Sequence, residues 1–489
     1  MKSEKTLPGK LEEIFHPRSI AVVGASGTPN TFGYLFMDYL IKAGYKGLLY
    51  PVNPNTEEIL GFRSYHSLKD IPGDVDYVIS CIGAGHVPEM IRQCPARNVK
   101  GVHLFTARMS ETGDKRGQAL EEEIASEAKR LDIPMIGPNC MGLYYPKEGL
   151  SFAYDLPAKS GKVGGIFQSG GISVNFIRYA GVRGVSFSKV ISFGNASGIN
   201  ECDLLEYLAG DDETSIIVIY IEGVRDGRRF FKTLREAAEI KPVIVLKGGK
   251  TGAGTRSSFS HTASIAGSFN SWEVMFRQCN AVQAVDMDEF VDLAVAFNFL
   301  PEITGKRVGV IGGSGGKVVL SADECEQSGL DVVDMPEDVL EVIRKRAPGL
   351  VNWIGNPVDF SILGGTDLVP MEFMQIMGKS SGFDFLICNV TEEAPFERAM
   401  WDQLITFEVN EYLKILSGGI KPIVATIANP GLGMRNTGEW HWKILMEKRE
   451  MLASEGLAVF PSVRSAATAI SKLVSYYQKK NGIRHGGAK

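Results

Sequence analysis

Residues 19–27, SIAVVGASG, decide the fold class of this chain, because a short apolar run ends in a glycine-containing turn. The helical pattern FGYLFMDYLIKAG at 32–44 follows it. Alternation of short strands with longer helices predicts an α/β fold with doubly wound parallel sheets. Strands buried on both faces are apolar throughout, as this run is. The same alternation recurs to the end of the chain, at strand candidates 47–54, 77–84, 101–107, 134–140, 163–171, 187–195, 215–223, 242–249, 307–316, 329–335, 384–390, 421–428 and 456–462.

The length of 489 residues exceeds what one hydrophobic core holds, and a prior of roughly 150 residues per domain predicts about three domains. We place the limits at 1–148, 149–300 and 301–489, where loops containing proline, glycine and lysine interrupt the pattern. The last two units are expected to be similar in size and strand order.

Composition excludes several classes of protein. The net charge of −5 arises from mixed acidic and basic residues without a basic stripe, so we expect no nucleic-acid partner. No apolar run reaches the roughly 18 residues that span a bilayer, and the first residues lack a secretory pattern, so we expect no membrane association. The 7 cysteines are dispersed, which favours reduced thiols in the cytoplasm.

The first turn places Gly24 and Gly27 between a strand and a helix. Backbone amides at such a turn can approach a phosphate group, and the helix N-terminus adds partial positive charge. The spacing is not G-x-G-x-x-G, and the second strand ends at Asn53 where a NAD site needs an acid. The turn therefore predicts another phosphate-bearing ligand, or only a tight turn that packing requires.

Two further turns join strands to helices through small residues. Gln168–Gly171 (QSGG) present Ser169, Gly170 and Gly171 as donors for a phosphate or a phosphorylated side chain. The turn at 312–317 (GGSGGK) superficially suggests a Walker A loop, but Lys317 is followed by valine, not by the serine or threonine that holds magnesium. We therefore exclude a P-loop kinase.

His261 lies among small residues in SHTASIAGS at 260–268. An imidazole can act as a general base, a metal ligand or a covalent phosphate carrier. No second ligand lies within several residues, so we expect no metal site, and FQSGG does not match the G-x-S-x-G turn of a serine hydrolase. A surface histidine without a role remains the simple alternative. The three amide-presenting turns favour a phosphorylated histidine, whose charge helix N-termini would stabilise.

The motifs IGPNCMGL at 136–143, FQSGGIS at 167–173, YIEG at 220–223, SHTASIAGS and NPVDF at 356–360 follow one another as in the NDP-forming acyl-CoA synthetases. The whole chain resembles the α subunit of ADP-forming acetate–CoA ligases, which are related to the succinyl-CoA synthetase α subunit. The resemblance implies an N-terminal CoA-binding Rossmann-like domain and two flavodoxin-like domains. It also implies conversion of acyl-CoA, phosphate and ADP to acid, CoA and ATP through an acyl phosphate and a phosphohistidine.

The resemblance also assigns site residues. His261 would carry the phosphoryl group and Glu222 would orient its imidazole. The remaining assignments fall into two groups: the CoA site would contain Gly24, Ser26, Gly27, Asn53, Pro54, Asn139 and Cys140, and the phosphate site Ser169, Gly170, Gly171, Thr262 and Ala263.

ADP or ATP and Mg²⁺ would bind to a separate ATP-grasp β subunit in an αβ hetero-oligomer, because the chain leaves no room for that domain. Trp353 near NPVDF suggests a shaped acyl pocket, although packing explains it equally well. Two alternatives stay open: a CoA-binding or regulatory protein, and a CoA-dependent enzyme with a different outcome on the same scaffold. Neither the acid nor the preference for ADP or GDP follows from the residues.

Overall fold

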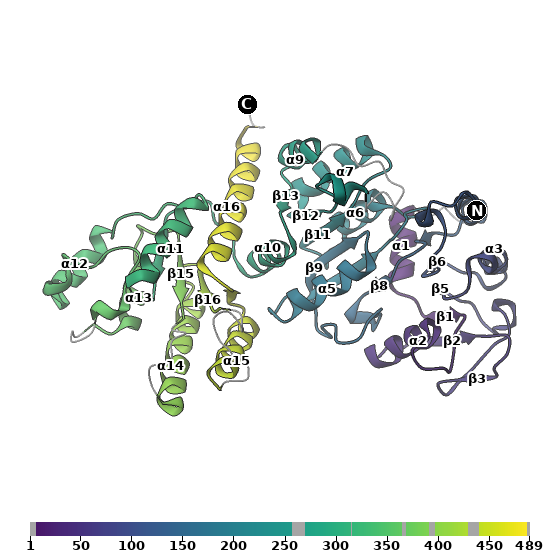
Figure 1. Ribbon diagram of the computed structural model, residues 1–489, viewed down its shortest axis with the longest axis horizontal. Helices are drawn as coiled ribbons and strands as arrows, with labels where there is room; N and C mark the ends of the chain where they lie inside the picture. The colour runs from purple at the N-terminus through teal and green to yellow at the C-terminus, as the bar shows by residue number, and fades with distance from the viewer. Residues whose placement is uncertain are drawn as a thin grey trace. The chain divides into compact units, whose positions relative to one another are not determined.

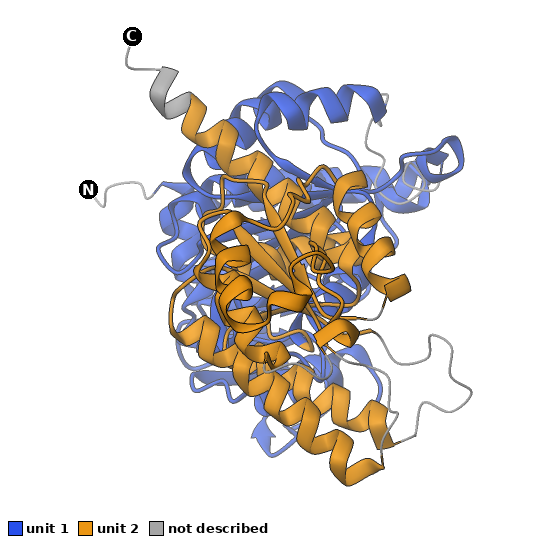
Figure 2. Cartoon of the chain, turned by 90° about the vertical axis from the view of Figure 1, so that its left-hand side faces the viewer, with its two compact units in different colours: residues 1–181, 186–287 blue, residues 182–185, 288–489 orange. Residues whose placement is uncertain are grey.

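The structure is a computed structural model that describes residues 6–256, 269–313, 315–363, 368–390, 397–428 and 440–486. The chain divides into two compact units (Figure 2). Unit 1 comprises residues 1–181 and 186–287, and unit 2 comprises residues 182–185 and 288–489. Among the described residues, unit 1 contains a five-stranded, a six-stranded and a small two-stranded sheet, and unit 2 contains a four-stranded sheet. Figure 1 labels most of their strands. The domain limits expected from the sequence remain a prediction.

The first sheet of unit 1 has five parallel strands in the order β2-β1-β5-β6-β7. Every strand expected within the first 142 residues is present. The strands are β1 (Ser19–Val23), β2 (Leu48–Val52), β5 (Tyr77–Ser80), β6 (Gly101–Leu104) and β7 (Met135–Ile136), with the two-stranded β3 (Glu58–Ile59) and β4 (Phe62–Arg63) beside them. The helices are α1 (Leu7–Phe15), α2 (Phe32–Ala43), α3 (Val87–Gln93) and α4 (Lys115–Arg130).

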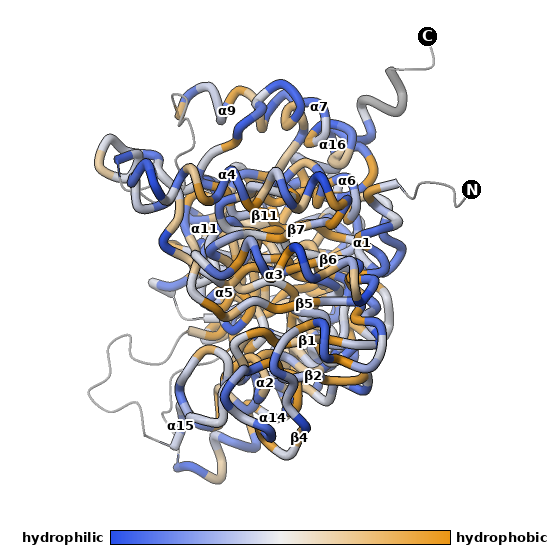
Figure 3. The backbone as a smooth tube through the Cα atoms, turned by 90° about the vertical axis from the view of Figure 1, so that its right-hand side faces the viewer, coloured by the Kyte–Doolittle hydropathy of each residue, from blue (hydrophilic) through white to orange (hydrophobic). Residues whose placement is uncertain are grey.

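The core of this first sheet forms between its strands and the apolar faces of its helices. Val78 and Val102 on the strands pack with Ile91 of α3 and Ile124 of α4, all fully buried. In Figure 3 the strands are mostly in hydrophobic colours, whereas α4 carries much blue. A helix with one apolar stripe buries that stripe against a neighbouring layer. The apolar positions in the helix sequences are therefore the ones that pack on this sheet.

The second sheet of unit 1 has the order β13-β12-β11-β9-β10-β8. Its first five strands are parallel, and β8 runs antiparallel to β10. β8 and β13 were not expected from the sequence. The strands are β8 (Gly142–Tyr144), β9 (Ser160–Phe167), β10 (Phe187–Ser192), β11 (Ile216–Ile221), β12 (Val243–Lys247) and β13 (Val282–Ala284), and the helices are α5 (Gly170–Gly181), α6 (Glu201–Gly210), α7 (Gly227–Ile240) and α9 (Phe269–Gln278).

The sheet of unit 2 has four parallel strands in the order β14-β15-β16-β17. Its strands are β14 (Val308–Ile311), β15 (Phe385–Asn389), β16 (Ile423–Thr426) and β17 (Ala458–Phe460). Its helices are α10 (Met287–Phe299), α11 (Gly315–Gln327), α12 (Glu337–Arg346), α13 (Pro370–Lys379), α14 (Arg398–Ser417), α15 (Trp440–Ser454) and α16 (Val463–Gly486).

The prediction of a strand at 329–335 is wrong, because this segment pairs with the sheet only through a bridge between Asp331 and Arg307. The Asn356 side chain occupies the place where the rest of the strand would lie. Its amide nitrogen donates to the carbonyls of Val308 and Val333, both at 2.8 Å. Its oxygen accepts the N–H of Val310 at 2.9 Å. One side chain therefore satisfies the edge that a second strand would otherwise cover.

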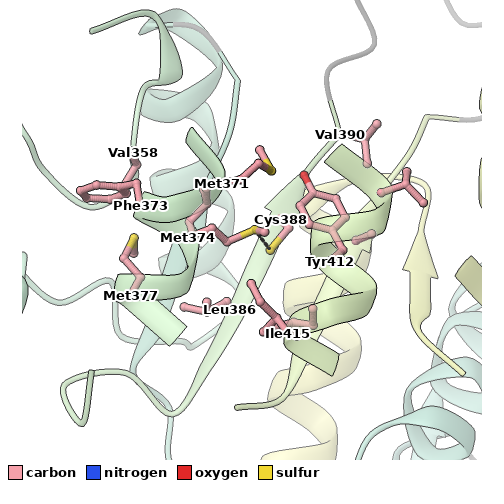
Figure 4. Packing of buried hydrophobic residues seen from close by; sticks show 14 of the residues in the cluster. Val358, Met371, Phe373, Met374, Met377, Leu386, Cys388, Val390, Tyr412 and Ile415 are labelled. Carbon is pink, nitrogen blue, oxygen red and sulfur yellow. Dashed lines mark hydrogen bonds between the residues drawn. The ribbon is translucent and has the colours of Figure 1, made fainter. Parts of the chain in front are cut away.

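The core of unit 2 lies between this sheet and helices α13 and α14 (Figure 4). Phe373 and Met374 of α13 are fully buried, as is Tyr412 of α14. The Cys388 thiol of β15 lies 3.7 Å from the Met374 sulfur. The expected α/β class with parallel sheets is confirmed. None of the helices in the described part of the chain is long and apolar enough to cross a bilayer.

Candidate functional site

A cavity of about 790 Å³ opens in unit 1, and every segment that lines it except Phe32 comes soon after the carboxyl end of a strand. Ligands of open α/β sheets bind at these ends, because the loops there vary without disturbing the sheet. The lining residues follow β5, β6 and β7 of the first sheet and β9, β10 and β11 of the second. They are Phe32, Cys81, Ile82, Gly83, Ala84, Phe105, Thr106, Ala107, Arg108, Asn139, Cys140, Met141, Gln168, Ser169, Gly170, Gly171, Gly194, Asn195 and Glu222.

One wall of the cavity is the N-terminus of α5, which begins at Gly170. Ser169 and Gly170 are half-buried, and Gly171 is exposed with open space where a side chain would project. A Cβ at Gly170 would come within 2.6 Å of the Met141 side chain, so a larger residue here would displace that side chain. The first amides of a helix lack intrahelical partners and attract an anion. This wall can therefore hold a phosphate group.

Glu222 lines the same cavity, held by three neighbours in the second sheet. The Tyr220 hydroxyl donates to its carboxylate at 3.1 Å, and burial raises the pKa of the Tyr220 phenol, with the Glu222 charge raising it further. The Glu222 N–H donates to the Gln168 side-chain oxygen at 2.7 Å. The Lys247 ammonium donates to the Glu222 carbonyl at 2.8 Å. Backbone and carboxylate are thus both fixed.

The turn at Asn139 and Cys140 also lines the cavity. Asn139 has a left-handed backbone with φ 58°, and its N–H donates to the Thr106 carbonyl at 3.0 Å. Cys140 is 3 % exposed, and burial raises the pKa of its thiol well above the ordinary value. A thiol kept protonated is a poor nucleophile. The turn can therefore pack against a ligand but gives no reactive thiolate.

A buried carboxylate ties the two sides of the cavity together. Glu121 of α4 accepts the Asn195 amide at 2.9 Å and the N–H of Ser110 at 3.0 Å. It also accepts the Ser197 hydroxyl. Asn195 in turn accepts from the Asn139 side chain at 3.4 Å. Loops of both sheets of unit 1 therefore share one acceptor, which fixes the shape of the opening.

The residues expected to bind CoA phosphates come together beside the cavity but do not line it. Gly24 has φ +86°, and a Cβ there would lie 2.9 Å from the Cys81 carbonyl. The Asn53 amide donates to the Ala25 carbonyl at 2.7 Å. Ser26 accepts the N–H of Thr28 at 3.0 Å, and α2 begins only at Phe32. The loop after β1 therefore continues past Gly27 to the expected start of the helix, and Pro54 is exposed next to Asn53.

Of the expected site residues, the cavity brings together Asn139, Cys140, Glu222 and the segment 169–171. His261, Thr262 and Ala263 lie outside the described residues. Trp353 is 78 % exposed and is not among the residues that line the cavity.

Sequence reasoning missed several lining residues, among them Arg108, Asn195 and the aromatic pair Phe32 and Phe105, whose ring centroids lie 4.5 Å apart. Phe105 and Asn195 lie at the ends of the expected strands 101–107 and 187–195, Arg108 directly follows the first of these, and Phe32 begins an expected helix. Asn195 also lies in residues 192–211, a stretch that carries the resemblance to the family, but it was not singled out there.

Two family models match the chain. A CoA binding domain matches residues 18–146, and a succinyl-CoA ligase like flavodoxin domain matches residues 160–297. The chain is also 31 % identical over 477 residues to the acetate–CoA ligase [ADP-forming] I subunit alpha of Pyrococcus furiosus, covering 96 % of this chain and 98 % of that one. The chain belongs to the NDP-forming acyl-CoA synthetase family. The resemblance seen in the sequence is confirmed, as is the enzyme class, acid–CoA ligase (ADP-forming), that goes with it.

Other members of this family are longer or have been solved with ligands. The chain is 36 % identical over 352 residues to the acetate–CoA ligase [ADP-forming] of Methanocaldococcus jannaschii, and that match covers 72 % of this chain but only 49 % of the relative. The dinucleotide forming acetyl-coenzyme A synthetase 1 of Ca. Korarchaeum cryptofilum was solved in complex with phosphate and ADP. It superposes with a TM-score of 0.81 at 28 % identity, covering 98 % of this chain and 99 % of that one.

Proposed function

We propose that this member of the NDP-forming acyl-CoA synthetase family is the α-type subunit of an ADP-forming acid–CoA ligase in the cytoplasm. It interconverts acyl-CoA, phosphate and ADP with a carboxylic acid, CoA and ATP. The observation that carries the proposal is the shared cavity, which joins the N-terminus of α5, the Glu222 carboxylate and the turn at Asn139. This chemistry needs three elements in one place. They are a site that binds phosphate, a carboxylate that accepts a hydrogen bond from an imidazole, and a wall against which the CoA thioester lies.

The first step is attack of a phosphate oxygen on the thioester carbonyl. The carbon–sulfur bond breaks, CoA leaves as its thiolate, and an acyl phosphate forms. The amides of Ser169, Gly170 and Gly171 hold the phosphate, because a helix N-terminus stabilises negative charge in a site that loses water. The thiol of Cys140 takes no covalent part, since burial keeps it protonated.

In the second step, a nitrogen of His261 attacks phosphorus and the carboxylate leaves. Glu222 accepts the other ring N–H, which fixes the tautomer and stabilises the imidazolium that forms. Thr262 and Ala263 contribute amides to the phosphoryl group. This assignment of His261 rests on the resemblance. The fixed carboxylate of Glu222, held by Tyr220 and Gln168, supports it.

CoA binds with its phosphates on Gly24, Ser26 and Gly27 and its nucleotide end near Asn53 and Pro54. The match of residues 18–146 to a CoA binding domain supports this placement. The phosphoryl group then passes to ADP, with Mg²⁺, on an ATP-grasp β subunit of an αβ hetero-oligomer. Relatives named as subunit alpha, together with single-chain relatives of about twice the matched length, support a separate partner.

The test is the intact mass of the purified chain after incubation with phosphate and a panel of acyl-CoAs. We expect an acid-labile gain of one phosphoryl group, about 80 Da, that His261→Ala abolishes and Glu222→Gln reduces by about 100-fold in rate. If no gain occurs, even with an ATP-grasp partner and ATP, the proposal is wrong and the chain is a CoA-binding or regulatory protein. Phosphorylation with nucleotide turnover but no stable thioester would instead indicate a different CoA-dependent enzyme.

A further inference from the structure

Arg108 lines the cavity in a conformation that is unfavourable for its residue type. It follows β6 in the segment Phe105–Arg108, and its φ is 69°, in the left-handed region. An arginine there clashes between Cβ and its own backbone, and such residues persist only where the surroundings fix them and are concentrated at functional sites.

The surroundings fix Arg108 firmly. The Glu111 carboxylate accepts the N–H of Arg108 and, at 3.1 Å, the N–H of Met109. The Met109 side chain is fully buried, and its carbonyl accepts the Thr112 hydroxyl at 2.8 Å. The left-handed backbone is therefore a built feature of this loop and not a frayed turn.

The charge of Arg108 is not neutralised locally. Among the residues that the structure describes, its guanidinium takes part in no ion pair. The nearest acid along the chain is Glu111. Its carboxylate oxygens accept the N–H groups of Arg108 and Met109 and, at 2.8 Å, the Asn195 side-chain amide. The Arg108 side chain is exposed at the cavity that also contains the N-terminus of α5. A cation held in this way is ready to receive an anion.

The cavity next to Arg108 is also apolar enough for an organic group. Phe105, three residues earlier in the same loop, packs with Phe32, and Ile82 and Met141 line the same space. At about 790 Å³ the cavity is far larger than a phosphate ion needs. An elongated acyl group therefore fits the apolar wall together with a charged end.

We infer that Arg108 is a binding residue for an oxyanion of the substrates, in the same cavity as the start of α5. The inference rests on the proposed function for the identity of the substrates. Two sources share this chemistry: the attacking inorganic phosphate, and a second carboxylate carried by the acyl group. Both would accept the paired N–H groups of a guanidinium.

The experiment is isothermal titration of the whole chain with three probes: inorganic phosphate, glutaryl-CoA and valeryl-CoA. The variant is Arg108→Gly, which removes the charge while glycine tolerates the left-handed backbone. Arg108→Lys keeps the positive charge but lacks the paired N–H donors of a planar guanidinium. Arg116→Gln changes an exposed arginine on α4 outside the cavity and is the matched control. Equal melting temperatures verify that the variants fold.

We expect Arg108→Gly to weaken one anion by at least tenfold, with partial recovery in Arg108→Lys. A weaker affinity for phosphate identifies phosphate as the source. Loss of the preference for glutaryl-CoA over valeryl-CoA identifies the carboxylate. If neither affinity changes by more than twofold, or if the wild-type chain binds neither anion, the inference is wrong.

The two proposals fail separately. The Arg108 inference can fail while the ligase proposal holds. In that case Arg108→Gly changes no anion affinity, valeryl-CoA still binds, and His261 is still phosphorylated. Binding of phosphate that depends on Arg108, without phosphorylation of His261 under any condition, leaves the anion site standing and overturns the ligase proposal.

Discussion

The N–H of Glu222 donates to the side-chain oxygen of Gln168 at 2.7 Å, and the same oxygen accepts the next N–H, that of Gly223, at 3.2 Å. Gln168 directly follows β9 and lies two residues before the start of α5, whereas Glu222 directly follows β11. One amide oxygen therefore sets the distance between the candidate imidazole acceptor and the candidate phosphate site.

The first prediction concerns this oxygen. Gln168→Met keeps the size of the side chain but leaves two backbone N–H groups near the cavity without their acceptor. We expect a loss of roughly 1–3 kcal/mol in the free energy of unfolding and a fall of about 10- to 100-fold in the rate of His261 phosphorylation, because Glu222 is no longer held. Urea titration and time-resolved intact mass measure the two effects.

Gln118→Met, on the exposed face of α4, is the matched control and should change neither quantity. A phosphorylation rate unchanged in Gln168→Met would show that the position of Glu222 does not depend on this oxygen.

The second prediction concerns Glu121, the carboxylate shared by loops of both sheets of unit 1. Glu121→Ala leaves the N–H of Ser110 and the Asn195 amide without this acceptor. We expect the free energy of unfolding of this variant to be lower than that of the wild type by roughly 2–4 kcal/mol. Amide hydrogen exchange at residues 106–112 and 193–198 should be faster. Exposed Glu122→Ala on the same helix should match the wild type, and equal exchange in both variants would refute the role.

The third prediction concerns the cavity thiols. Burial raises the pKa of both Cys81 and Cys140 well above the ordinary value. Native protein at pH 8 should therefore react with iodoacetamide at least tenfold more slowly at both positions than the chain unfolded in guanidinium chloride, since the thiolate is the nucleophile. Cys140→Ala should phosphorylate His261 within about threefold of the wild-type rate. Rapid alkylation of native Cys140, read by peptide mass, would contradict this account.

The fourth prediction is a pH dependence. Burial lowers the pKa of His103 from 6.5 to about 4, even though its ring bonds the Cys140 carbonyl at 2.9 Å. As the pH falls below 6.5, the unfolded chain takes up this proton and the folded chain does not, so the free energy of unfolding falls until the pH reaches about 4. The difference amounts to roughly 3 kcal/mol.

His103→Gln keeps a donor and does not titrate, so its stability should decline less than that of the wild type between pH 6.5 and 4. Exposed His66→Gln should follow the wild-type curve. Parallel curves for wild type and His103→Gln, from urea titrations across this window, would contradict the shift.

Much of the fold follows from local pattern. β1 and β5 are apolar except for one serine at an end of each, so their sequences alone identify them as buried strands. β8 and β13 were missed because they are defined by their pairing with β10 and β12 and not by a local pattern. The segment at 329–335 has the composition of a strand, but the Asn356 side chain forms the hydrogen bonds to β14 that a strand would otherwise form.

The candidate site divides in the same way. Motifs pointed to Glu222 and to Ser169–Gly171, because each lies in a short and specific pattern. Arg108 lies in no such pattern, and the stretch around Asn195 did not single out this residue. They reach the cavity because two sheets of unit 1 present their strand ends to the same space, which is a property of tertiary packing that no short stretch of sequence contains.

The outer side of β14 has a consequence for how this protein behaves in concentrated solution. Asp331 accepts the N–H of Val308, Asn356 binds the next groups, and the N–H of Val358 donates to the Val310 carbonyl at 2.8 Å. An unpaired sheet margin is a template on which a second molecule can add its own strand. Here that template is already occupied by side chains and loop backbone, so molecules of this protein can collide without joining their sheets at β14.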